Sequence, residues 1–143
     1  MKSHATGIRI AVAYLAVTAL ATVLYWLDFF TAGSVHVRQD AVYLAFERAF
    51  PLADAWMAAC SLLGAIGLWR RRPWGLLFGL LAGSAQIFLA GMDVMFNLNE
   101  GNYAIASRAM AIEILINAGL LVGAPLLIAF LWRRRAELLY DAA

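Results

Sequence analysis

Four long apolar stretches, separated by short polar segments, make up most of the chain. Each has about 20 or more mainly apolar residues, which is the length that an α-helix needs to cross the hydrocarbon core of a bilayer. They run approximately over Ile10–Phe30, Pro51–Trp69, Trp74–Phe96 and Ile105–Trp132. The pattern predicts an all-α fold, a bundle of four transmembrane helices.

The segments between these stretches predict how the helices are connected. Arg70–Pro73 is a short turn, so the second and third helices should be antiparallel neighbours. Residues 97–104 are rich in asparagine, which predicts a polar loop. The longest connection covers residues 31–50. Within it, Ala41–Phe50 has the apolar spacing of a short amphipathic helix lying over the outer end of the bundle.

Basic residues predict the orientation of the bundle, because cytoplasmic segments of membrane proteins carry an excess of lysine and arginine. Most of them come before the first stretch, between the second and third, and after the fourth. They are Lys2, Arg9, Arg70, Arg71, Arg72, Arg133, Arg134 and Arg135. Four spans bring all of these positions to one side. We therefore expect a multi-pass integral membrane protein with both termini in the cytoplasm.

Composition agrees with a membrane protein and limits other sites. Hydrophobic residues make up 64% of the chain and charged residues 14%, against roughly 45–50% and 25% in soluble domains. The 143 residues predict a single domain over residues 1–143. Cys60 is the only cysteine, and neither His4 nor His36 has a second ligand at metal-binding spacing. We expect no metal site, no cofactor and no nucleic-acid partner.

Polar residues inside the apolar stretches recur at helical spacing, so each helix carries one polar stripe. The stripes consist of Tyr14, Thr18, Thr22, Tyr25 and Asp28 in the first stretch, Asp54 and Ser61 in the second, Gln86, Asp93 and Asn97 in the third, and Glu113 and Asn117 in the fourth. A polar stripe in lipid must face protein or water. Four such stripes predict a polar core within the bundle.

One acidic residue lies in, or at the outer end of, each stretch: Asp28, Asp54, Asp93 and Glu113. Ionisable groups at membrane depth are costly and often mark functional sites. Counted along the helices from the inner arginines, the four acids gather near the outer end, with Gln86 deeper. This distribution predicts a pocket that opens outward or sideways, closed toward the cytoplasm, rather than a continuous pore.

Each acid also has a structural interpretation. Asp54 lies in the first turn of its helix, where a negative charge complements the helix dipole, and Asp28 can lie in interfacial water. Arg108 could form an ion pair with Asp93 or Glu113. Asp93 shares a face with other polar residues and Glu113 lies at least one turn inside its helix, so these two are the strongest candidates for chemistry.

Glycines at four-residue spacing let helices pack closely in lipid. Gly75, Gly79 and Gly83 form a doubled GxxxG motif, and Gly119 and Gly123 form a single one. The first interpretation is packing within the bundle. The alternative is a homodimer through these glycine faces.

Several short segments resemble the YvaD-like family of small bacterial four-helix membrane proteins. They are Tyr25–Leu27, Pro51–Asp54 and the third stretch with Gly83, Gln86 and Asp93. The resemblance implies a bacterial protein of the inner, cytoplasmic membrane and carries no function with it.

The architecture is also similar, more loosely, to the EXPERA superfamily, which contains emopamil-binding sterol isomerases and the sigma-2 receptor. That similarity implies four or five spans, a cytoplasmic N-terminus and acidic residues in a lipid pocket of the outer half. Asp28 and Asp54 match this plan. The pocket histidine of the superfamily has no counterpart here, which leaves its isomerase chemistry without support.

If two or more of the carboxyl groups converge, burial and like-charge repulsion prevent all of them from staying ionised. One is then protonated beside an ionised neighbour, as in a general acid and its partner. We expect Asp93 and Glu113 to be the acid and base, with Asp54 and Asp28 as electrostatic partners.

The neighbouring side chains predict an apolar or aromatic ligand. The expected orienting groups and walls are Gln86, Asn117, Tyr25, Trp26, Trp56, Phe88 and Met92. An acidic pocket with aromatic walls suits a carbocation or an ammonium group. The first hypothesis is a binding protein or enzyme for a lipophilic, isoprenoid-like molecule, with isomerisation, cyclisation or epoxide opening as its chemistry.

Two other classes stay open. An accessory or structural subunit of a membrane complex would use the acids only at the interface with water. A proton-coupled small transporter would need a polar path across the whole membrane, and the inner halves of the four stretches are almost entirely apolar. Whether the protein is an enzyme is therefore undecided by the sequence.

Overall fold

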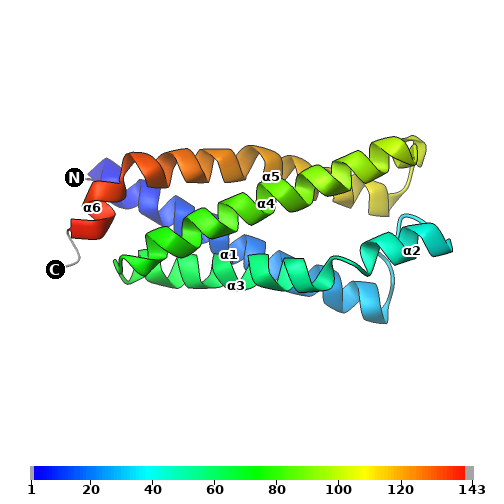
Figure 1. Cartoon of the computed structure of the whole chain (residues 1–143), viewed down its shortest axis with the longest axis horizontal. Helices are drawn as coiled ribbons and strands as arrows, with labels where there is room; N and C mark the ends of the chain where they lie inside the picture. The colour runs from blue at the N-terminus through cyan, green and yellow to red at the C-terminus, as the bar shows by residue number, and fades with distance from the viewer. Residues whose placement is uncertain (1, 141–143) are drawn as a thin grey trace.

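The computed structural model describes the backbone of residues 2–140 and the side chains of residues 6–139. The part described is mainly helical and has no strand, which confirms the predicted all-α fold class. Four long helices form the bundle: α1 (Lys2–Thr31), α3 (Pro51–Trp69), α4 (Trp74–Asn99) and α5 (Arg108–Arg133) (Figure 1). Three short helices join or follow them: α2 (Ala41–Glu47), the 3₁₀-helix η1 (Asn102–Ala104) and α6 (Arg135–Tyr140). The side chains of Lys2 and His4 lie outside the described residues.

The helix bounds differ from the apolar bounds where local capping decides. Helix α3 covers the predicted range, and its first residue, Pro51, is well suited to a helix start. Helix α5 begins three residues later than predicted, because the Ser107 side chain accepts a hydrogen bond from the Met110 backbone N–H and caps it. Helix α2 is the predicted amphipathic segment, and Asp40 caps it in the same way.

Four helical segments are long and apolar enough to cross a membrane: Thr6–Thr31, Ala41–Trp69, Trp74–Asn99 and Arg108–Arg133. Both chain ends lie at one end of the bundle, which we call the terminal end (Figure 1). Helix α2 and the connection between α4 and α5 lie at the opposite end, here the α2 end. The placement of the terminal end in the cytoplasm stays a prediction.

Glycines bring the long helices together in the order α1, α3, α4, α5. A side chain at Gly64 of α3 would lie 2.9 Å from the backbone nitrogen of Gly79 on α4, so the two backbones are nearly in contact. On its other side α4 receives α5, and Ile128 fills the space beside Gly83. The Gly75, Gly79 and Gly83 stripe is therefore used within this chain, and a homodimer stays a prediction.

Helices α1 and α5 meet at the terminal end and diverge toward the α2 end (Figure 1). At the terminal end, the Tyr14 ring lies against Gly123 and the Phe130 ring against Gly7. An apolar core fills the bundle there, and it consists of Ala11, Leu15, Cys60, Ala65, Leu68, Leu76, Ala82, Leu127 and Leu131. The divergence leaves a space between α1 and α5 in the other half of the bundle.

Candidate functional site

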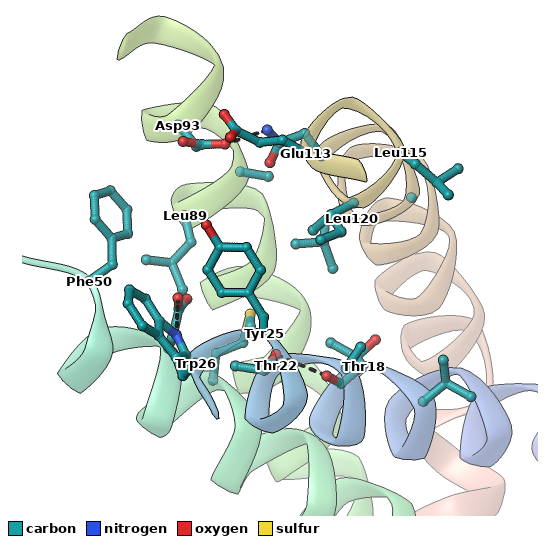
Figure 2. A pocket seen from close by; sticks show the side chains of 18 of the residues that line it. Thr18, Thr22, Tyr25, Trp26, Phe50, Leu89, Asp93, Glu113, Leu115 and Leu120 are labelled. Carbon is teal, nitrogen blue, oxygen red and sulfur yellow. Dashed lines mark hydrogen bonds between the residues drawn. The ribbon is translucent and has the colours of Figure 1, made fainter. Parts of the chain in front are cut away.

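A cavity of about 260 Å³ occupies the space between α1 and α5 (Figure 2). Residues of α1 and α5 form its two sides, and α2, α3 and α4 supply the remaining walls. Most of the walls are apolar or aromatic, from residues such as Val17, Trp26, Leu89, Leu115 and Leu120. A ligand in this cavity would therefore contact mainly hydrocarbon and aromatic rings.

Four carboxyl groups line the cavity, one from each of α2, α3, α4 and α5. They belong to Glu47, Asp54, Asp93 and Glu113. The lining contains no lysine, arginine or histidine. Among the described residues, no ion pair joins Arg108 to Asp93 or Glu113. The acids are therefore not neutralised by the arginine that the sequence offered as a partner.

Asp93 and Glu113 point toward each other across the α4–α5 contact (Figure 2). Asn117, one turn along α5, donates to Asp93 Oδ2, and Asn97, one turn along α4, donates to Glu113 Oε1. The Asn97 amide also lies 3.4 Å from Asp93 Oδ1. Glu113 is only 5% exposed. Its other oxygen, Oε2, is buried and has no hydrogen-bond partner among the described residues.

The other two acids are held by aromatic residues of α1. The Trp26 indole N–H donates to Asp54 Oδ2 over 2.9 Å, and the Tyr25 hydroxyl donates to Glu47 Oε2 over 3.2 Å. Asp54 does lie in the first turn of α3, as the dipole interpretation requires. It also lines the cavity. Its position therefore serves both the helix and the site.

Gln86 lies beneath the cavity and closes it toward the terminal end. It is fully buried, its Oε1 accepts a 2.6 Å hydrogen bond from the Tyr14 hydroxyl, and its amide nitrogen lies 3.4 Å from the Ser61 hydroxyl. Tyr14 lines the cavity, whereas Gln86 does not. The expected role of Gln86 as an orienting group for the ligand therefore becomes a role in holding Tyr14.

The structure brings Asp93, Glu113, Asp54, Asn117, Tyr25 and Trp26 together on the cavity wall, as the sequence predicts. It places Asp28 elsewhere. The Asp28 carboxylate accepts hydrogen bonds from the Ser34 hydroxyl and the Val35 backbone N–H, so it closes the turn that follows α1.

Three of the expected aromatic and apolar wall residues face away from the cavity. Trp56, Phe88 and Met92 are 56%, 66% and 45% exposed on the outside of the bundle. The reason is the 100° turn per residue of an α-helix. Phe88 is two residues from the buried Gln86, which puts it on the opposite side of α4. Phe50, which was not expected at the site, does line the cavity.

Glu47 is the functional candidate that the sequence reasoning missed. It lies near the end of α2, is buried and lines the cavity. A signal was present, because Tyr43 and Glu47 are four residues apart and share one face of the short helix. Because that face of α2 covers the bundle, Glu47 was a candidate for the polar core.

Comparisons of the chain with protein-family models, with curated proteins and with solved structures found no match. The resemblance to the YvaD-like family and to the EXPERA superfamily therefore stays a prediction. The function is argued from the cavity and its residues.

Proposed function

We propose that this integral membrane protein takes a lipophilic small molecule from the bilayer into the acidic cavity, where Glu113 and Asp93 exchange a proton with it. The observation that carries the proposal is the buried, unpartnered Oε2 atom of Glu113, in a cavity lined by four carboxyl groups and no basic residue. An unpaired polar group of this kind is costly in a fold, and such groups concentrate at functional sites.

The route into the cavity is the space between α1 and α5. Val17 on α1 and Leu115 on α5 line the cavity and are 64% and 73% exposed. In a bilayer these side chains face lipid, so an apolar molecule could enter sideways without crossing water. The cavity is slightly smaller than the usual range of about 300–1,000 Å³ for ligand pockets. It suits a small lipophile, or the reactive end of a longer one whose tail stays in the bilayer.

Hydrogen bonds assign different roles to the two central acids. Both oxygens of Asp93 face amide N–H donors, from Asn117 and Asn97, which is the environment of an ionised carboxylate. Glu113 receives a donor only at Oε1. A proton shared between the two groups therefore belongs on Glu113 Oε2. Glu113 is the acid of this proposal and Asp93 is the base.

The pair can carry out an isomerisation with no net gain or loss of protons. Glu113 Oε2–H gives its proton to an alkene carbon or an epoxide oxygen of the ligand, and positive charge develops on carbon. The carboxyl oxygens of Asp54 and Glu47 stabilise that charge, and the aromatic rings of Tyr25 and Trp26 add to the stabilisation. Asp93 then removes a proton from a neighbouring carbon and passes it back to Glu113.

A transporter is less well supported. Transport would need a polar path from one end of the bundle to the other. Below Gln86, the described residues of the terminal half pack as a continuous apolar core around Leu15, Leu68 and Leu131. The cavity is therefore closed toward the terminal end.

Native mass spectrometry of the membrane-extracted protein tests the proposal through two matched glycine variants. Gly119 lines the cavity, Gly91 does not, and a Cβ atom added at either position meets nothing within 4 Å. Gly119→Trp should fill the cavity and abolish a co-purifying lipophile, whereas Gly91→Trp should keep it. Absence of any bound lipophile from the unaltered protein, or equal retention by both variants, would contradict the proposal and favour an accessory subunit.

A further inference from the structure

Two buried asparagines connect the cavity to an arginine of the loop between α1 and α2. We propose that Arg38 is a positioning residue that sets the orientation of the Glu113 carboxyl group through Asn102 and Asn97. Asn102 belongs to η1 and Asn97 to α4, so the connection joins four separate segments of the chain. The inference rests on the proposed function for its meaning in turnover, but its hydrogen bonds can be tested without a substrate.

The connection is an unbroken series of three hydrogen bonds. Arg38 Nη1 donates to Asn102 Oδ1 over 3.0 Å, and Asn102 Nδ2 donates to Asn97 Oδ1 over 2.8 Å. Asn97 Nδ2 then donates to Glu113 Oε1. Asn97 is 0% and Asn102 1% exposed. Water therefore cannot replace either partner, and each amide depends on its neighbour in the series.

The direction of the series follows from the chemistry of its first member. A guanidinium group has only donors, so Asn102 must turn its carbonyl oxygen toward Arg38. The Asn102 amide nitrogen then faces Asn97, and Asn97 must present its own oxygen there. The only group that Asn97 can offer to Glu113 is its N–H. The Asn97 N–H group also faces two acceptors of Asp93, the backbone oxygen at 3.1 Å and Oδ1 at 3.4 Å, which favour the same orientation. Arg38 therefore determines which way Asn102 is turned and, together with Asp93, holds Asn97.

This orientation decides which oxygen of Glu113 can hold a proton. Oε1 accepts from Asn97 and is occupied, so the proton belongs on Oε2, which has no hydrogen-bond partner among the described residues. Without Arg38, Asn102 is free to turn over and to offer its oxygen to Asn97, and Asn97 is then held only by its acceptors on Asp93. The turned-over state of Asn97 becomes more populated, and in that state its oxygen faces Glu113 and the proton moves to Oε1, in a hydrogen bond that holds it away from the cavity. Arg38 therefore keeps the acid available.

Arg38 is itself held in place, and its anchors supply control variants. Its Nε lies 2.6 Å from Asp40 Oδ2, and its Nη1 lies 3.3 Å from Glu100 Oε2. Among the described residues, neither carboxylate is hydrogen-bonded to either asparagine of the series. Asp40→Asn and Glu100→Gln each remove one ion pair and leave the bond from Arg38 to Asn102 in place.

Dicyclohexylcarbodiimide is a suitable probe, because it dissolves in the bilayer and reacts with protonated carboxyl groups. The acid proton moves to a carbodiimide nitrogen and the carboxylate oxygen bonds to the central carbon. The adduct then rearranges to a stable N-acylurea with no leaving group. Labelling of the full chain in lipid nanodiscs is located by peptide mass spectrometry. We expect the unaltered protein to be labelled at Glu113.

Arg38→Met should slow labelling of Glu113 by roughly 3- to 10-fold, the effect of one lost hydrogen bond. Arg38→Lys keeps one donor for Asn102 and should restore the rate to within about twofold. Asn102→Leu should slow labelling as much as Arg38→Met, and the double variant should be no slower than either. The Asp40→Asn and Glu100→Gln controls should stay within about twofold of the unaltered protein.

An unchanged or faster rate in Arg38→Met overturns the inference, and so does an equal loss in the two controls, since that would indicate a general loosening of the loop. If the unaltered protein is not labelled at Glu113, the proton carrier of the proposed function is wrong. The series is then judged by thermal unfolding of Arg38→Met, Asn97→Leu and the double variant. If the losses of stability in the two single variants add up in the double variant, the inference is overturned. If the double variant is no less stable than the less stable single variant, the inference is supported.

Discussion

At the scale of single residues, the site depends on a carboxyl group that has a donor on one oxygen only. Glu113→Gln keeps the shape of the side chain and removes its acid proton. We expect turnover to fall by roughly 10²-fold or more, because a general acid is lost. The free energy of unfolding should stay within about 1 kcal/mol of that of the unaltered protein, because the amide replaces a carboxyl group that is already neutral.

Asp28→Asn is the matched control for this prediction. Asp28 is an acid at the end of a long apolar helix, like those of the cavity, but its carboxylate binds Ser34 and Val35 in the turn after α1. Product formation should therefore stay near that of the unaltered protein. Equal losses of turnover in Asp28→Asn and Glu113→Gln would show that the acids act through the fold and not through the cavity.

The Asp40 cap makes the stability of α2 depend on pH, and the pKa of its carboxyl group gives the sign. The backbone N–H of Tyr43 and the Arg38 guanidinium hold the pKa of the Asp40 carboxyl below its usual value of 3.8. The ionised cap therefore stabilises the folded protein fully above the unfolded-state pKa. Its contribution is lost as pH falls through the lower folded-state pKa.

We expect hydrogen exchange of the α2 backbone amides, corrected for the intrinsic rate, to accelerate as the pH falls below about 3.8. Asp40→Asn still offers an uncharged oxygen to the Val42 and Tyr43 N–H groups and does not titrate. The acid-induced acceleration should be absent from this variant. The same acceleration in both proteins would assign it to another acid of the region.

At the scale of the elements, the sequence predicted the helices better than their rotations. Hydropathy located α3 at Pro51–Trp69, and helical spacing placed Asp93 and Glu113 on facing stripes. Spacing also identified Gln86 as an inward-facing residue. Phe88 was expected in the same pocket, but it lies on the other side of the same helix. Polar residues in lipid must face protein. Large apolar residues can face either protein or lipid, so their residue type does not predict which way the side chain points.

The short helix α2 shows a second limit. Its existence follows from apolar spacing and from the Asp40 cap, both of which are local. The contact of Glu47 with Tyr25 depends on how a connection of about 20 residues folds back over the bundle. No local pattern determines that path. The residues joined through space by loops, such as Arg38 and Asn102, escaped sequence reasoning for the same reason.

Gly101 gives a prediction at the end of α4. Its backbone has a φ of +66°, in the left-handed region, and this turn brings Asn102 beside Asn97. A side chain at Gly101 meets nothing within 4 Å, so a substitution acts through the backbone alone. Gly101→Ala should lower the free energy of unfolding by about 1 kcal/mol, measured by thermal unfolding in detergent.

Gly91→Ala is the control with the opposite sign. Gly91 lies within α4, also in open space, and has no positive φ. Alanine is favoured over glycine in a helix interior by up to about 1 kcal/mol. This variant should therefore be at least as stable as the unaltered protein. A loss of stability equal to that of Gly101→Ala would mean that the left-handed backbone is not the cause.

At the scale of the whole molecule, the bundle is divided along its length. At the terminal end α1 and α5 meet over an apolar core, and at the α2 end they separate around the acids. The close glycine contacts hold α3 and α4 together, and the bundle opens on its other side, between α1 and α5. The end of the bundle that faces the cytoplasm therefore decides in which half of the bilayer the cavity lies.

Single cysteines at the two ends test the predicted orientation. The arginines at positions 70–72 and 133–135 lie at the terminal end, which predicts that this end is cytoplasmic. Cys60 is buried and should not react in the folded protein. In intact cells, a charged maleimide should label Ala32→Cys, which is exposed just after α1, and should label Ala136→Cys on α6 only after permeabilisation. The reverse pattern would place the cavity in the cytoplasmic half of the bilayer, and its ligand would then have to be sought among molecules of the inner leaflet.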